Sequence, residues 1–135
     1  MIDASIIKIA SITNNVGLKN VFTHKSVVKN SLCGDTIKTE FIVENSKIKS
    51  MRYETESCIL CEASASLFSR KIKNKKINII KKDIKEIKQL KKTSNYTFTK
   101  KFSEFNKLIN KKNINRLNCV ILPMEAFLKA FKVNK

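Results

Sequence analysis

The sequence lacks any long uninterrupted apolar run. No stretch approaches the roughly 20 residues needed to cross a bilayer, so we expect a soluble protein with no membrane partner. The first residues also lack the basic region and the small-residue cleavage site of a secretory signal, and they carry an acid at Asp3. These absences predict a cytoplasmic protein whose cysteines are reduced.

Arginine is also scarce. Only Arg52, Arg70 and Arg116 are arginines among the 28 basic residues, although the net charge is +17. A charge of that size would suit nucleic acid, an anionic membrane or an acidic protein. The excess of lysine, isoleucine and asparagine is typical of drift in an AT-rich genome, where lysine replaces arginine wherever a solvated charge is enough. We therefore treat the charge as weak evidence about partners.

The length limits the number of domains. With 135 residues and 42% hydrophobic content, the chain can bury one core, and a two-domain enzyme is not expected. We predict a single domain over residues 1–135.

Periodicity predicts a helix followed by strands in the first half of the chain. Residues 2–13 place apolar side chains at helical spacing. Val27-Val28 is a β-prone run, and residues 36–44 alternate apolar and polar side chains. We expect a small antiparallel sheet of about three strands, built mostly from residues 20–55.

A second clear strand is expected to follow a turn at Asn45-Ser46. The apolar residues of that strand include Ile48 and Met51, whose spacing of three breaks strict alternation. An extra residue in one strand of an antiparallel pair produces this kind of break. The spacing therefore predicts a β-bulge.

The second half of the chain has helical patterns. Residues 61–68 are small and not β-branched, which favours a helix packed closely against another element. Isoleucines recur at spacings of three and four over residues 70–92, which predicts an amphipathic helix with a basic face. A further helix is expected after Thr97, and a last one with Pro123 near its first turn. Strands followed by helices predict an α+β fold with the helices packed on one face of the sheet.

Four cysteines carry most of the candidate chemistry. In a chain with reduced thiols, metal binding or thiol chemistry is favoured over a disulfide framework. Cys33-Gly34-Asp35 lies in a turn where glycine lets the backbone bring a thiol and a carboxylate to one point. Both side chains can then reach the same metal ion.

The other cysteines also lie near the ends of predicted elements. Cys58 and Cys61 stand where a strand leads into a helix, and the unpaired N–H groups of a helix N-terminus favour thiolate. Cys119 lies at the start of the last helix and follows Arg116, whose charge can stabilise a nearby thiolate. The alternative interpretation is that these are inert buried thiols. His24, which is far from every cysteine in sequence, is given a structural role.

These motifs resemble those of the IscU/SufU/NifU-N family of iron–sulfur scaffolds. The resemblance runs from about Val27 to the C-terminus and rests on three segments: 31–35 (SLCGD), 57–66 (SCILCEASAS) and 116–124 (RLNCVILPM). The family signature is a C-G-D loop, a G-C-x-x-x-x-A-S-x-S turn into a helix, and a last cysteine shortly before L-P. Asn118, where the IscU branch has histidine, and the long spacing between the last two motif cysteines resemble the SufU branch.

The resemblance implies a fold, a ligand set and partners. The implied fold is SufE/IscU-like, and the implied ligands of a zinc ion or a transient [2Fe–2S] or [4Fe–4S] cluster are Cys33, Asp35, Cys58 and Cys119. Cys61, where many relatives have serine, is an alternative ligand, because it makes five candidates for a metal that takes four. The implied partners are a cysteine desulfurase of the SufS/IscS type, which supplies persulfide sulfur, and apo iron–sulfur acceptor proteins or carriers.

Two functions stay open at this point. The chain is either a scaffold that assembles and passes on a cluster or a zinc-dependent sulfurtransferase in which Cys33 accepts the persulfide and Arg116 supports a thiolate. The first is not an enzyme, and the second is one only in the sense of sulfur transfer. A basic module that binds nucleic acid ranks a distant third.

Overall fold

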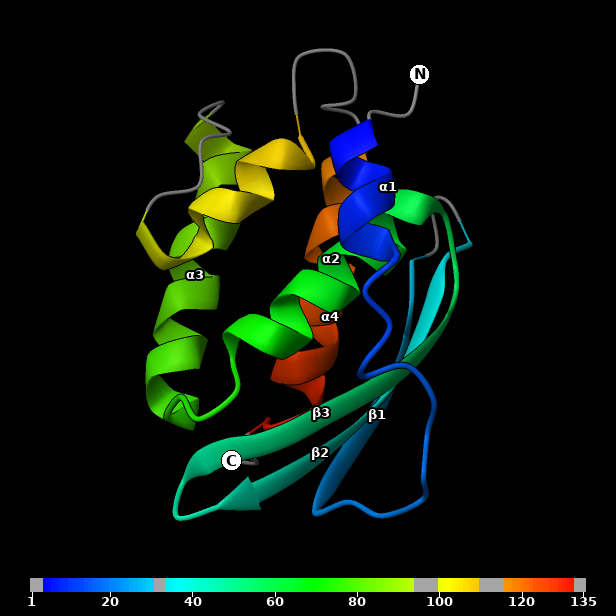
Figure 1. Ribbon diagram of the computed structural model, residues 1–135. Helices are drawn as coiled ribbons and strands as arrows, with labels where there is room; N and C mark the ends of the chain where they lie inside the picture. Colours follow the sequence, from blue (N-terminus) through cyan, green and yellow to red (C-terminus); the bar gives the residue numbers. More distant parts are fainter. Residues whose placement is uncertain (1–3, 31–33, 94–99, 110–115, 133–135) are drawn as a thin grey trace.

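The computed structural model describes residues 4–30, 34–93, 100–109 and 116–132 (Figure 1). It confirms an α+β architecture in which most strands precede most helices. In chain order the elements are α1 (Ala4–Ala10), β1 (His24–Lys29), β2 (Thr36–Glu44), β3 (Lys47–Glu56), α2 (Ile59–Lys71), α3 (Ile77–Thr93), the 3-10 helix η1 (Lys100–Lys107) and α4 (Leu117–Ala130).

The sheet is antiparallel, with strand order β1-β2-β3. Asn45 and Ser46 join β2 to β3, and both have positive φ values, 55° and 64°. A two-residue turn with two positive φ angles matches the twist of a hairpin. The register shifts between Ile42 and Val43, which confirms the predicted bulge, because Ile42 pairs with Ser50 and Val43 with Ile48.

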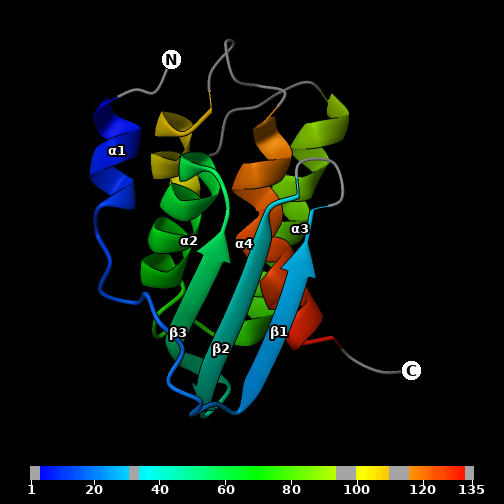
Figure 2. The same ribbon diagram turned by 90° about the vertical axis from the view of Figure 1, so that its right-hand side faces the viewer.

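Helices cover one face of this sheet. Figure 2 shows α2 and α4 side by side behind the strands, and Figure 1 shows α3 farther from the sheet. The covered face presents Phe41, whose ring meets that of Phe127 of α4 edge to face at 5.6 Å. Phe127 in turn meets Phe68 of α2 at 6.0 Å. All three rings are fully buried, so they form the centre of the core.

The small residues of α2 allow this close packing. Ala63 and Ala65 are fully buried. Ser64 donates its hydroxyl to the carbonyl of Val120 in α4, and Ser66 donates to the carbonyl of Ile12 at 2.7 Å. These bonds satisfy the buried hydroxyls. The predicted close packing of this helix is confirmed.

Three helix predictions need correction. The basic segment is not one helix over 70–92, because α2 continues to Lys71 and Asn74, with φ 67°, separates it from α3. Residues 100–107 form a 3-10 helix, whose period of three fits the spacing of Phe102 and Phe105. Pro123 lies in the interior of α4 and not near its first turn, since the helix already begins at Leu117. Thr97 lies outside the described residues.

The stripe of α3 is as predicted. Ile80, Ile84 and Ile87 are buried, whereas Lys82 and Lys85 are exposed. In the described part of the chain, no helix is both long and apolar enough to cross a membrane.

Candidate metal centre

Three side chains from separate elements meet at one end of the sheet. Asp35 directly precedes β2, Cys58 is the N-cap residue of α2, and Cys119 lies in the first turn of α4. One carboxylate oxygen and the two Sγ atoms all lie within 4.8 Å of one another. This is the spacing at which one metal ion can contact all three donors.

The sheet register brings the first two donors together. Thr36 pairs with Glu56, so the start of β2 lies beside the end of β3. Asp35 precedes that pair and Cys58 follows it closely. The third donor is placed by helix packing, because Ser64 of α2 holds the carbonyl of Val120, the residue after Cys119.

The turn before Asp35 is also held by the backbone. Gly34 has φ +79°, a conformation that side-chain-bearing residues rarely adopt, and its N–H donates to the carbonyl of Asn30 at 2.7 Å. The N–H of Asn30 donates to the carbonyl of Asp35 at 2.7 Å. These bonds extend the pairing of β1 and β2 and fix the backbone of Asp35 at the site.

Asp35 is unusual among the polar groups of this protein. Its side chain is only 7% exposed, and its Oδ2 atom has no hydrogen-bond partner in the part of the chain that the structure describes. A buried carboxylate oxygen without a donor is costly unless a cation compensates its charge. The orphaned oxygen beside two thiols therefore fits a metal ligand.

Arg116 lies beside both thiols. The pKa of its guanidinium is raised above the usual value, first because its side chain hydrogen-bonds to Cys119 and next through the negative charge of Cys58. Arg116 thus supplies a positive charge next to both sulfur atoms. Arg116 is the N-cap residue of α4, so the start of that helix positions the cation as well as Cys119.

The remaining candidates lie elsewhere. Cys33 falls outside the described residues. Cys61 is fully buried in the core and is not a member of the three-donor cluster. The ring of His24 packs on Phe131 with centroids 4.5 Å apart, which suits the structural role expected for it.

The donor set determines which metals fit. Two thiolates and a carboxylate suit zinc or iron, and a tetrahedral site needs one further donor. Such a centre can hold a metal ion or the edge of a small cluster, and the partial exposure of Cys58 leaves it reachable from solvent.

Sequence reasoning gave no role to Glu54, Glu56 and Glu62. All three line a cavity of about 420 Å³, together with Thr36, the residue that follows Asp35. Their signal in the sequence is local: three of the 11 acids in a strongly basic chain fall within nine positions.

Comparisons with known proteins place the chain in a structural context. The family model described as NifU-like N terminal domain matches residues 4–101. The fold resembles a nitrogen-fixing NifU-like protein (N-terminal) from Brucella abortus, with TM-score 0.82 and 16% identity over 96% of this chain and 91% of that one.

A second solved structure is as similar. It is a protein from Fervidobacterium islandicum described as a putative iron–sulfur cluster assembly scaffold for the SUF system, with TM-score 0.83 and 20% identity over 97% of this chain and 96% of that one. A hypothetical protein matches with TM-score 0.63 and 18% identity over 96% of each chain. No match was found among curated proteins.

Proposed function

The chain belongs to the family of NifU-like N-terminal domains, and from that premise we propose that it is an iron–sulfur cluster assembly scaffold. Its ligands for iron, or for a nascent [2Fe–2S] or [4Fe–4S] cluster, are Cys33, Asp35, Cys58 and Cys119. The observation that carries the proposal is the buried Oδ2 of Asp35, which has no partner among the described residues and belongs to a group of donors within 4.8 Å of one another. Cys33, two positions before Asp35 in the sequence, supplies the fourth donor.

Sulfur arrives as a persulfide from a cysteine desulfurase. The thiolate of Cys33 attacks the outer sulfur of the partner's persulfide, the S–S bond of that persulfide breaks, and the partner's cysteine leaves as a thiolate. Cys33 then carries the persulfide, so no external oxidant or reductant is needed in this step. Arg116, which lies beside Cys58 and Cys119, is proposed to support their thiolates while the metal is exchanged.

Asp35 is the exchangeable ligand of the site. A carboxylate oxygen is a poorer partner for a soft metal–sulfur centre than a thiolate is. Its release opens a position for incoming sulfur or for an acceptor's ligand. In Asp35→Ala, metal should persist on three cysteines but should transfer slowly to an apo acceptor. Transfer at the wild-type rate in this variant would show that a ligand other than Asp35 is the exchangeable one.

Cys61 is the reserve ligand in that hypothesis. If it completes the coordination when Asp35 is absent, Asp35→Ala/Cys61→Ser should hold metal less firmly than Asp35→Ala. Equal retention in the two variants would assign Cys61 to the core alone, where it is fully buried.

The experiment that tests the scaffold function is anaerobic reconstitution with iron, sulfide and a desulfurase. A scaffold retains visible charge-transfer absorption after desalting, and Cys33→Ser, Cys58→Ser and Cys119→Ser each lose most of it, because each removes one of a minimal set of soft ligands. Cys61→Ala is the matched control, since it removes a thiol outside the cluster. Near-normal metal content in two of the three ligand variants would refute the ligand assignment.

A zinc-dependent sulfurtransferase is the second candidate. Two thiols and a carboxylate, with Cys33 as the fourth ligand, also fit tetrahedral zinc, and the SufU-like Asn118 before Cys119 favours this branch. Tight zinc binding and stimulation of the desulfurase, with no cluster retained after desalting, would decide for it.

The lysine-rich surface is proposed to steer docking of the desulfurase. Lys73, Lys75, Lys76 and Lys82 are exposed around the α2–α3 junction, and Lys81 is half-buried beside them. Charge reversal there should slow association and flatten its salt dependence without changing bound metal. Association that is unchanged between low and high salt would refute the steering role.

A further inference from the structure

The outer edge of β3 is only partly covered. Near its middle, the N–H of Tyr53 donates to the carbonyl of Asn15 at 3.1 Å, and the carbonyl of Tyr53 accepts from Gly17 at 2.8 Å. The segment around Val16 thus adds a short parallel bridge to the sheet. Because alternate residues of a strand direct their backbone groups to the same side, the N–H and carbonyl of Thr55 also point away from β2.

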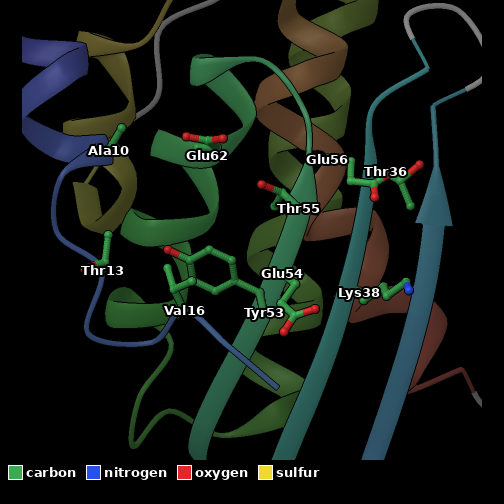
Figure 3. A pocket seen from close by; sticks show the side chains of 10 residues that line it. All are labelled: Ala10, Thr13, Val16, Thr36, Lys38, Tyr53, Glu54, Thr55, Glu56 and Glu62. Atoms are coloured by element: carbon green, nitrogen blue, oxygen red, sulfur yellow. The ribbon is translucent and has the colours of Figure 1, made fainter. Parts of the chain in front are cut away.

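Among the described residues, Thr55 has no such neighbour. Asn74 and Lys75 bond to Ile48 near the start of β3, but no backbone hydrogen bond covers the part of the edge that follows Tyr53 in this part of the chain. The free edge instead faces the cavity of about 420 Å³, shown in Figure 3. Ala10, Thr13 and Val16 lie on one side of Tyr53 and Thr55, with Glu62 of α2 above them. An exposed strand edge beside a groove is a template for pairing with another extended chain.

The charge of the groove opposes that of the protein. Its charged lining residues are Glu54, Glu56 and Glu62 against a single lysine, Lys38, whereas the whole chain carries +17. All four of these side chains are exposed. One oxygen of Glu54 accepts the N–H of Leu18 at 3.2 Å, which holds that carboxylate at the rim. The groove therefore suits a segment that carries lysine or arginine.

We propose that the groove between the free edge of β3 and the α1–Val16 segment binds an extended basic segment of a partner protein, which pairs with Thr55 as an added strand. The pairing supplies backbone hydrogen bonds, and the three glutamates select basic side chains. A second copy of this chain is disfavoured by its like charge. The proposal does not depend on the metal centre, since none of its residues is a proposed ligand.

The test uses defined peptides and the full chain. Binding of acetyl-Val-Lys-Val-Lys-Val-amide is measured by isothermal titration and by NMR shifts of the Thr55 amide. The same peptide with glutamate in place of lysine should not bind. Two N-methylated versions of the peptide are compared, one methylated at the valine nitrogens and the other at the lysine nitrogens. Their affinities should differ, because only one edge of the peptide pairs with β3. Equal binding of both versions, or of the acidic and basic peptides, would overturn the proposal.

Variants test the groove itself. Glu54→Gln and Glu56→Gln should each weaken binding about twofold to fivefold, the range of exposed charge pairs, and Lys38→Gln should strengthen it by a similar factor. Glu44→Gln is the matched control, because it changes the net charge equally at an exposed glutamate outside the groove. Equal weakening of binding in Glu44→Gln would show that the effect depends only on the net charge of the protein, and it would overturn the proposed site.

Thr55→Pro removes the outward N–H but no hydrogen bond of the β2–β3 ladder, so it should abolish binding while the circular dichroism spectrum is kept. If this variant unfolds, the N-methylated peptides test the same pairing from the ligand side. Concentration-dependent dimerisation that Thr55→Pro abolishes would assign the edge to a second copy and overturn the partner proposed here.

Discussion

Two buried carboxylates on β2 and just before it have opposite surroundings. Glu40 is 6% exposed and accepts backbone N–H groups from Lys19 at 2.8 Å and from Asn20 at 3.0 Å. Asp35 is 7% exposed, yet its Oδ2 has no partner among the described residues. The outer face of the sheet thus satisfies its acid from within the chain, whereas the acid at the end of the sheet is the proposed ligand of a cation. Stability is given up where a ligand binds.

The largest effect is expected at the satisfied carboxylate. Glu40→Ala should lower the free energy of unfolding by about 2 kcal/mol, because hydrogen bonds to a charged acceptor are lost and the segment at residues 18–20 is released. Chemical denaturation measures this change. Glu44→Ala, which removes an exposed carboxylate from the same strand, should stay within about 0.5 kcal/mol of wild type.

At the unsatisfied carboxylate the sign should reverse. Asp35→Ala should raise the free energy of unfolding of the metal-free protein by about 1 kcal/mol, because a buried charge without a donor is removed. In the metal-loaded protein the same variant should lose part of the stabilisation that metal provides. A loss of stability in the metal-free variant would mean that Asp35 is satisfied within the chain.

The buried phenol of Tyr53 allows a pH test of how much a satisfied polar group contributes to stability. Burial raises the pKa of the Tyr53 phenol above 10.0, and a hydrogen bond with Ser66 opposes that shift. The unfolded chain therefore ionises first, so the contribution of Tyr53 is present below pH 10 and is lost as pH rises through the folded pKa. Tyr53→Phe should cost about 1 kcal/mol at pH 7 and lose less stability than wild type in alkaline solution.

The smallest effect is expected at an exposed ion pair. Lys71 at the end of α2 hydrogen-bonds to Glu104 of η1, which lowers the pKa of that carboxyl below 4.5. Glu104 is 45% exposed, so solvent screens the pair, and Lys71→Ala should cost about 0.5 kcal/mol or less. This contribution is present above pH 4.5 and is lost as pH falls through the folded pKa. An acid titration of wild type and variant measures it.

Much of the fold follows from local patterns. Alternation over residues 36–44, the turn at Asn45-Ser46 and the spacing of Ile48 and Met51 predicted the hairpin and its bulge correctly, because each depends on neighbouring residues in one pair of strands. The helix boundaries were less predictable. Residues 70–92 have one apolar stripe, and only the turn at Asn74 separates α2 from α3.

The sequence by itself determined the approximate order of strands and helices and indicated the candidate ligands. Tertiary structure decided which of them meet. Asp35 and Cys58 come together because β2 and β3 are paired, but Cys119 joins them only because α4 packs on α2 through small side chains and the bond from Ser64 to Val120. The free edge beside Thr55 likewise depends on where the distant Val16 segment stops covering β3. Periodicity is a property of neighbouring residues, whereas these contacts depend on the packing of whole elements.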